Sequence, residues 1–280
     1  MKIARVFPRR TKATPIDDLA FYDTPDLFPP DVDAIHVSVA FTYDLPRAEK
    51  LAKAWKAIGP VSIGGPALGG RGEAFTPGKY LRHGYTITSR GCPNRCWFCS
   101  VWKREGPVRE LPVRDGWNVL DDNLLACSDE HIRSVFAMVK RQNRRAEFTG
   151  GLEAARLKGW HVDGLRDCKP HSLFFAYDTP DDLEPLRHAG KMLIEGGFTV
   201  ASHSLRAYVI MGYPNDTMEK AEKRLRETME AGFLPMAMLW RDEHGERDRW
   251  WMKFQSQWAR PARIVAREYP KEASSERTDR

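Results

Sequence analysis

The chain has 280 residues, of which 42% are hydrophobic, and its 44 basic and 38 acidic side chains give a formal net charge of +6. This length and apolar content suffice to bury the core of one large domain, or of a domain with a small partner. No apolar run approaches the ~20 residues of a membrane span, and the N-terminal residues hold no signal-peptide core. Three of the five cysteines are clustered, which excludes a disulfide framework. We therefore expect a soluble, cytoplasmic protein.

Residues 1–78 are predicted to form a small α/β unit. Short apolar, β-branched runs at 2–7, 34–41 and 61–63 predict strands. Residues 46–58 predict a helix, because Ala48, Leu51 and Trp55 recur at helical spacing. This alternation favours a parallel βαβ unit, a shortened Rossmann-like domain. The glycines between 64 and 72 do not follow G-x-G-x-x-G, so we expect a loop there and not a dinucleotide site.

Residues 79–244 are predicted to form a second, larger α/β domain. Its strands are expected at 85–89, 117–120, 146–149, 172–177, 206–212 and 234–240. Helices are expected after Ser128, after Thr179 and over 216–230, where apolar residues recur at helical spacing. Such alternation favours a parallel sheet or barrel, whose functional residues gather at the carboxyl ends of the strands. Residues 245–280 form an aromatic and basic extension, whose aromatic stripe we expect to pack on the domain.

One short run carries the clearest chemical signal. Cys92, Cys96 and Cys99 are spaced C-x3-C-x2-C, and thiolates select zinc, copper(I) or iron–sulfur centres. Three ligands leave a four-coordinate centre one ligand short, which keeps a position open for substrate. The alternative is a structural zinc site with His83 or Cys127 as the fourth ligand. Zinc sites usually bring their ligands as two pairs, and no second pair is present.

The run from Ser89 to Ser100 resembles the signature of the radical S-adenosylmethionine (radical SAM) enzymes. Its Ser-Arg-Gly-Cys-Pro lead-in is similar to the branch that contains cobalamin-binding domains and methylthiotransferases. The resemblance implies that the cysteines hold three irons of a [4Fe-4S] cluster, that S-adenosylmethionine chelates the fourth iron, and that Phe98 lies near its adenine. It covers residues 79–240 and implies a partial (β/α)6 TIM-like barrel. The cobalamin motif D-x-H-x-x-G is absent near His36, so we expect no histidine-ligated cobalamin.

The resemblance also implies further cofactor contacts. Two stretches could replace the family's Gly-Gly-Glu motif, which meets the methionine amine. Asp121 and Asp122 follow the second strand, and Gly150, Gly151 and Glu153 follow the third. Asp122 is the preferred partner of the amine, with Glu153 as its rival or as a carboxylate on the substrate side; helix capping is the structural alternative for these acids. The remaining expected contacts are Asp178 and Thr179 with the ribose, Arg206 with the carboxylate, and Gly212 beside the adenine.

The predicted function is reductive cleavage of S-adenosylmethionine to a 5′-deoxyadenosyl radical, which abstracts hydrogen from a substrate that the sequence does not identify. Small molecules, peptides and nucleic acids all remain open, and no catalytic residue is assigned. Residues 79–110 carry seven Lys or Arg against two Glu, which suits docking of an acidic flavodoxin or ferredoxin. Only Cys127 and Cys168 remain, too few for a second cluster. The alternative is a zinc-stabilised, basic, nucleic-acid-associated binding protein.

Overall fold

The computed structural model describes residues 1–71, 74–242, 245, 248–259 and 263–264. Its N-terminal unit is a parallel sheet of β1 (Ile3–Val6), β2 (Ala20–Phe21), β3 (Ala34–Ser38) and β4 (Val61–Gly64) in the order β2-β1-β3-β4. Helix α1 (Leu45–Trp55) packs on one face of this sheet through Leu51 and Trp55, which are almost fully buried. The predicted parallel βαβ unit is therefore present.

The opposite face of this small sheet is polar and contacts the linker to the second domain. Arg5 donates to the carbonyl oxygens of Gly78 and Lys79 at 3.0 and 2.9 Å. The His36 Nδ1 atom lies 2.5 Å from the Tyr80 hydroxyl. These bonds tie residues 78–80 to the sheet, so the N-terminal unit is anchored to the start of the second domain.

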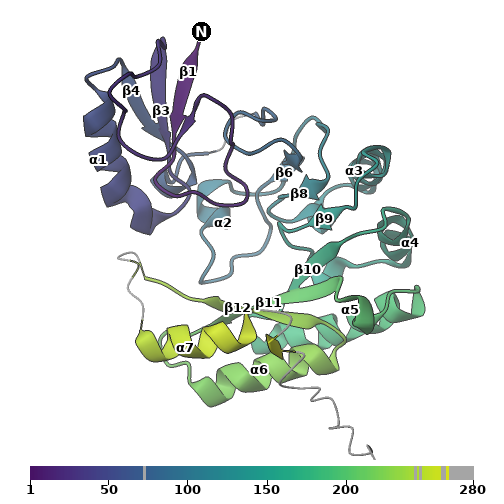
Figure 1. The fold of residues 1–280 in the computed structure, drawn as a ribbon. Coiled ribbons are helices and arrows are strands. Elements are labelled where there is room, and N and C mark those ends of the chain that lie inside the picture. The colour runs from purple at the N-terminus through teal and green to yellow at the C-terminus, as the bar shows by residue number, and fades with distance from the viewer. Residues whose placement is uncertain (72–73, 243–244, 246–247, 260–262, 265–280) are drawn as a thin grey trace, which may run out of the picture.

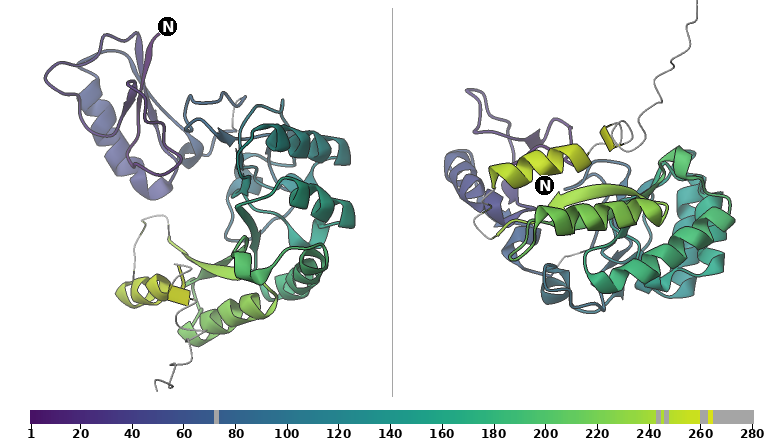
Figure 2. Two further views of the ribbon diagram at one scale, coloured as in Figure 1. Left: turned by 45° about the vertical axis from the view of Figure 1, so that its right-hand side comes forward. Right: turned by 90° about the horizontal axis from the view of Figure 1, so that it is seen from below.

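The second domain contains a six-stranded parallel sheet whose spatial order follows the chain. Its strands are β5 (Tyr85–Thr86), β8 (Asn118–Val119), β9 (Glu147–Phe148), β10 (Ser172–Ala176), β11 (Leu205–Met211) and β12 (Leu234–Leu239). The helices α3 (Asp129–Arg141), α4 (Gly159–Asp167), α5 (Leu183–Glu195) and α6 (Met218–Glu230) lie along one side of it (Figures 1 and 2). The six predicted strands are all present, although several are shorter than expected.

The alternation along β11 shows which side of the sheet holds the core. Leu205, Ala207, Val209 and Met211 are buried toward the helices, whereas the residues between them are only half-buried. On the other side of the sheet, away from the helices and here called the inner side, the Tyr208 ring stacks on Phe174 with centroids 4.5 Å apart. The inner side of the sheet is therefore left partly open, as a ligand site requires.

Local signals explain the helix boundaries. The Ser128 hydroxyl accepts from the His131 amide at 3.2 Å and begins α3, with acids in the first turn and Lys140 and Arg141 in the last. Helix α4 was not predicted, because it is short and includes two glycines, which disfavour helices. At Gly164 a Cβ atom would lie 2.4 Å from the Phe136 ring, so this glycine permits close packing against α3.

The aromatic stripe of the C-terminal extension packs as expected. Asp248 caps α7 (Arg249–Trp258) by accepting from the amides of Trp250 and Trp251. Phe254 and Trp258 are buried in the cluster that α7 forms with β11, β12 and α6, whereas Trp250 is 69% exposed. Apart from residues 263–264, the extension beyond 259 lies outside the described residues. Among the described helices, none combines the length and hydropathy that crossing a bilayer would need.

Candidate cysteine-loop site

A small antiparallel ribbon holds the cysteine loop. β6 (Ser89–Arg90) pairs with β7 (Arg109–Glu110), and the helix between them, α2 (Val101–Arg104), has only four residues. Gly91 adopts φ 88°, and a Cβ atom there would lie 2.3 Å from the Pro107 carbonyl oxygen. The Cys92 amide donates to Gly106 at 3.1 Å. The first β/α segment is therefore irregular, with a helix of only four residues, and this irregularity shapes the loop.

Two acids after β8 brace the start of this loop. Asp121 is 1% exposed and accepts from the Thr88 amide, the Thr88 hydroxyl and the Ser89 hydroxyl at 2.6, 2.5 and 2.9 Å. Burial raises the pKa of Asp121, and these hydrogen bonds oppose the rise. Asp122 accepts from the Gly91 amide at 2.8 Å. An enclosed Asp121 anchors the loop, and this placement does not support its expected contact with a cofactor amine.

A polar chain links the next strand to the first cysteine. Asn123 Nδ2 lies 3.4 Å from Cys92 Sγ and 2.6 Å from Glu153 Oε2. Arg156 Nε donates to the same Glu153 oxygen at 2.6 Å. Asn123 is 4% exposed, and its Oδ1 atom has no hydrogen-bond partner among the described residues. Sequence reasoning did not single out Asn123, although it directly follows the acidic pair.

The glycines before Glu153 allow this approach. At Gly150 a Cβ atom would lie 2.1 Å from the Asp121 carbonyl oxygen, so only glycine lets the loops after β8 and β9 touch. Gly151 adopts φ 114° with open space around its Cα atom. The structure therefore brings both predicted acidic stretches to the same edge of the sheet, and it places Glu153 next to the cysteine loop.

A second carboxylate pair follows β10. Asp178 Oδ1 accepts from the Ile210 amide at 2.7 Å, and the Asp178 amide donates to Asp182 Oδ2 at 3.0 Å. The amide and hydroxyl of Thr179 donate to the same Asp182 oxygen, so Thr179 takes part in the cap of the following helix. Burial raises the pKa of Asp178 to about 7; nearby Asp182 adds to the rise, whereas the Ile210 amide and Arg224 oppose it.

The thiols and these carboxylates share one electrostatic neighbourhood. Burial raises the pKa of Cys96, with further contributions from Cys99, Cys92, Asp182 and Asp178. Burial also raises the pKa of Cys99, helped by Cys92 and Asp122 and opposed by the Val101 amide and Arg104. All three cysteines are half-buried and free of disulfides. A cationic metal centre would relieve this accumulation of potential negative charge.

Aromatic side chains connect the loop to the end of β11. Trp97 meets Phe98 edge-on at 5.3 Å and Tyr213 at 5.2 Å between ring centroids. Gly212 adopts φ 71°, and a Cβ atom there would lie 3.0 Å from the Trp251 ring. Phe98 and Gly212 therefore belong to two segments that Trp97 and Tyr213 join, and sequence reasoning missed the joining pair.

Arg206 lies away from these residues. It is the second residue of β11, its Nε atom donates to His203 at 3.1 Å, and its guanidinium lies over the Phe174 ring. A parallel strand rises ~3.3 Å per residue, so the backbone at Ile210, beside Asp178, is ~13 Å further along. The expected contact of Arg206 with the cofactor carboxylate does not fit this position, because β11 delivers it to the opposite edge of the sheet.

The basic segment around the loop is partly neutralised. Glu105 has a side chain that is 2% exposed and pairs with Arg104 and Arg109 at 3.1 and 3.4 Å. These two arginines therefore pair with a buried carboxylate, and the Arg109 side chain stays 34% exposed. Arg95 and Lys103 remain exposed on the loop.

The donor set suits a multi-iron cluster. Among the described residues, no three His, Cys, Asp or Glu side chains converge on one point as a single metal ion would require. A cluster binds each cysteine at a different iron, so its ligands need not converge. Of the zinc alternatives, His83 packs against Gly78, and burial raises the pKa of the Cys127 thiol to about 12. Burial likewise raises the pKa of Cys168 to about 12. Three thiols are soft ligands, and they leave one iron of a [4Fe-4S] cluster without a protein ligand, which fits the expected cluster.

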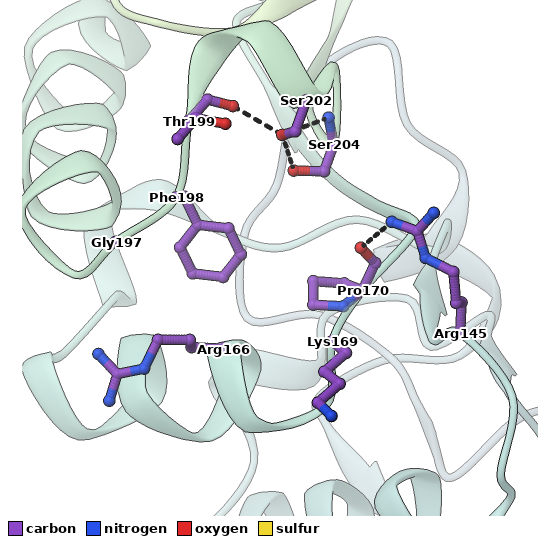
Figure 3. Close-up of a pocket in the computed structure, with 9 residues that line it drawn as sticks. All are labelled: Arg145, Arg166, Lys169, Pro170, Gly197, Phe198, Thr199, Ser202 and Ser204. Carbon is purple, nitrogen blue, oxygen red and sulfur yellow. Dashed lines mark hydrogen bonds between the residues drawn. The ribbon is translucent and has the colours of Figure 1, made fainter.

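A separate pocket of about 250 Å³ lies at the other edge of the sheet (Figure 3). Its lining includes Arg145, which donates to the Pro170 carbonyl at 3.3 Å, and Ser204, whose hydroxyl bonds to that of Ser202 at 2.8 Å. Pro170 and Ser204 directly precede β10 and β11 by one or two residues. This pocket is therefore not part of the cysteine-loop site.

Comparison with known proteins supports the fold. A similar solved structure is "radical S-adenosylmethionine methyltransferase, TsrM, from Kitasatospora setae with cobalamin and [4Fe-4S] cluster bound", with a TM-score of 0.56 and 11% sequence identity. The match covers 75% of this chain and 64% of that chain, so this chain matches less than two thirds of its neighbour. No protein-family model and no curated protein sequence matches significantly. The protein thus has a mixed α/β fold with parallel sheets, similar to that of a radical SAM methyltransferase.

Proposed function

We propose that this protein is a radical SAM enzyme whose six-stranded sheet is the family's partial (β/α)6 barrel. One observation carries the proposal. The C-x3-C-x2-C loop lies at the carboxyl edge of a parallel sheet, next to carboxylates from β8, β9 and β10, in a fold similar to that of TsrM. When bound, a reduced [4Fe-4S] cluster would transfer an electron to S-adenosylmethionine, breaking a C–S bond to give methionine and a 5′-deoxyadenosyl radical that abstracts hydrogen from substrate.

The predicted residues nearest the cysteine loop then have defined parts in binding. Cys92, Cys96 and Cys99 hold the cluster, and Asp121 and Asp122 keep their loop in place. Asp122 and Glu153 both stay candidate partners for the methionine amine. One oxygen of each already accepts from the protein, Asp122 Oδ2 from the Gly91 amide and Glu153 Oε2 from Asn123 and Arg156.

The ribose and adenine contacts remain proposals that rest on position. Asp178 and Thr179 end β10 where ribose contacts are expected, and Phe98 and Gly212 stand on the two segments that Trp97 bridges. Arg206 has no part in this site. The substrate is not assigned.

We propose that the N-terminal unit covers one side of the barrel mouth. Arg241, just after β12, places its guanidinium 4.5 Å from the centroid of the Tyr43 ring, so the carboxyl edge of the large sheet meets the N-terminal unit. TsrM was solved with cobalamin. This chain lacks the D-x-H-x-x-G motif, and the His36 ring is engaged with Tyr80. A histidine-ligated cobalamin is therefore not part of the proposal.

An electron donor completes the scheme. We propose a flavodoxin or ferredoxin in the cytoplasm that approaches the exposed Arg95 and Lys103, because opposite charges accelerate association. Arg104 and Arg109 pair with Glu105, whereas Arg95 and Lys103 are exposed beside the cysteines and Arg82 is exposed before them.

The test is formation of 5′-deoxyadenosine by anaerobically reconstituted protein with S-adenosylmethionine and dithionite. Wild type and Cys168→Ala should form it, since Cys168 lies in the core and bonds to the Phe136 carbonyl. Cys96→Ala should not. Equal yields from Cys96→Ala and Cys168→Ala would refute the assignment of the cysteine loop.

A further inference from the structure

The Asn123 side chain joins the predicted cluster to a neighbouring carboxylate, and no other role described above uses it. Its Nδ2 atom lies 2.6 Å from Glu153 Oε2 and 3.4 Å from Cys92 Sγ. The Nδ2 atom faces the carboxylate, because a flipped side chain would place Oδ1 against the carboxylate oxygen. The amide must therefore present its two N–H donors to the carboxylate and the sulfur.

The surroundings strengthen these contacts. Asn123 is 4% exposed, and hydrogen bonds in such a low-dielectric environment are electrostatically stronger than in water. Arg156 pairs with the same Glu153 oxygen at 2.6 Å and partly offsets its charge. The Asn123 amide is thus fixed between the Glu153–Arg156 ion pair and the Cys92 sulfur, and it cannot rotate without losing a charge-assisted hydrogen bond.

We infer that Asn123 is a positioning residue that sets the reduction potential of the cluster through its hydrogen bond to the Cys92 sulfur, with Glu153 opposing it. This inference rests on the proposed function. Reduction adds one electron to the cluster, and its negative charge spreads onto the cysteine sulfurs. A donor to sulfur stabilises that reduced state, and a nearby carboxylate destabilises it.

The orphaned amide oxygen adds a second observation. Asn123 Oδ1 is buried and has no hydrogen-bond partner in the part of the chain that the structure describes. An unsatisfied buried acceptor destabilises a fold unless a ligand pairs with it. A donor group bound beside Glu153 would satisfy this oxygen. The same side chain would then contact both the cluster sulfur and the bound ligand, so that ligand binding affects the cluster directly.

The experiment is a potentiometric titration of the reconstituted holoprotein, with dithionite as electron source and the reduced cluster followed by electron paramagnetic resonance. Asn123→Leu removes the donor at similar size and should make the midpoint more negative. At the wild-type midpoint we expect the reduced-to-oxidised ratio to fall about tenfold, equivalent to about 59 mV for one electron. Glu153→Gln removes the opposing charge and should make the midpoint more positive.

A matched control is available on β8, the strand that precedes Asn123 in the chain. Asn118 is also 4% exposed, and the hydrogen bonds of its side-chain amide go to Glu147 and Thr149 and not to a sulfur atom. Asn118→Leu therefore imposes a similar packing cost and should leave the midpoint unchanged. If loosening of the fold were the cause, the midpoint potential would shift in Asn118→Leu as it does in Asn123→Leu.

An unchanged midpoint in Asn123→Leu with full iron content overturns the inference, as does a shift of the same sign in Asn123→Leu and Glu153→Gln. If Asn123→Leu does not retain iron, the isosteric Asn123→Asp and Glu153→Gln decide by their opposite shifts. If both Asn123 variants lose iron, an unmoved midpoint in Glu153→Gln alone overturns it. Wild-type protein that binds no cluster contradicts the proposed function instead, so the two failures are distinguishable.

Discussion

Asp178→Asn should stabilise the metal-free protein near neutral pH. The pKa of Asp178 rises from its ordinary 3.8 to about 7 because the carboxyl is buried, with Asp182 adding to the effect. Between these values the folded state holds a proton that the unfolded state has lost, so the free energy of unfolding falls as pH rises. The contribution is fully present below pH 3.8 and lost as pH passes about 7.

The size follows from the shift. About three pKa units at ~1.36 kcal/mol each give an upper value of about 4 kcal/mol. The residue keeps partial exposure, so we expect about 2 to 4 kcal/mol. Asparagine avoids this loss, because its amide oxygen still accepts from the Ile210 amide and it carries no charge toward Asp182.

Urea unfolding followed by circular dichroism from pH 4 to pH 8, with a thiol reductant present, measures this effect. The difference between Asp178→Asn and wild type should grow in favour of the variant as pH rises through this range. The comparison cancels other titrating groups common to both proteins, such as His161, whose pKa burial lowers to about 4. Parallel stability curves for the two proteins across this range would refute the reasoning.

Three further outcomes are expected. Cys127→Ala should retain the iron that Cys96→Ala loses, measured on anaerobically reconstituted protein; equal loss would indicate a fourth protein ligand. Lys103→Glu should slow reduction by flavodoxin several-fold at low salt but not by dithionite, because only the protein donor needs a docking face; equal slowing by both reductants would contradict docking. Gly91→Ala should lower the urea midpoint and the iron content together, since a Cβ atom would lie 2.3 Å from the Pro107 oxygen at φ 88°; wild-type values would show that the loop adapts.

The fold was largely predictable because its signals are local. Periodic apolar residues and a serine cap defined α3, and alternating burial along β11 follows from a sheet with helices on one side. Helix α4 escaped prediction because its two glycines weaken the local signal, and its stability comes from packing against Phe136. The buried Glu105, which pairs with Arg104 and Arg109, is likewise a consequence of tertiary packing.

The candidate site was predictable only in part. The cysteine spacing is a short-range pattern, so the sequence alone identified the loop. The contact between Asn123 and Glu153 joins residues thirty positions apart and depends on how Gly150 packs on Asp121. Arg206 was expected in the site because its guanidinium can pair with a carboxylate through two hydrogen bonds, but the direction of β11 puts it at the other edge. Residue type alone does not reveal which end of a strand a side chain occupies.

Metal analysis of anaerobically purified protein tests the central claim most directly. The account predicts about four irons and about four sulfides per chain, as one [4Fe-4S] cluster on the three-cysteine loop requires. About eight irons would indicate a second cluster, which the two remaining cysteines do not explain. Stoichiometric zinc without iron would contradict the account and support a zinc-stabilised binding protein instead.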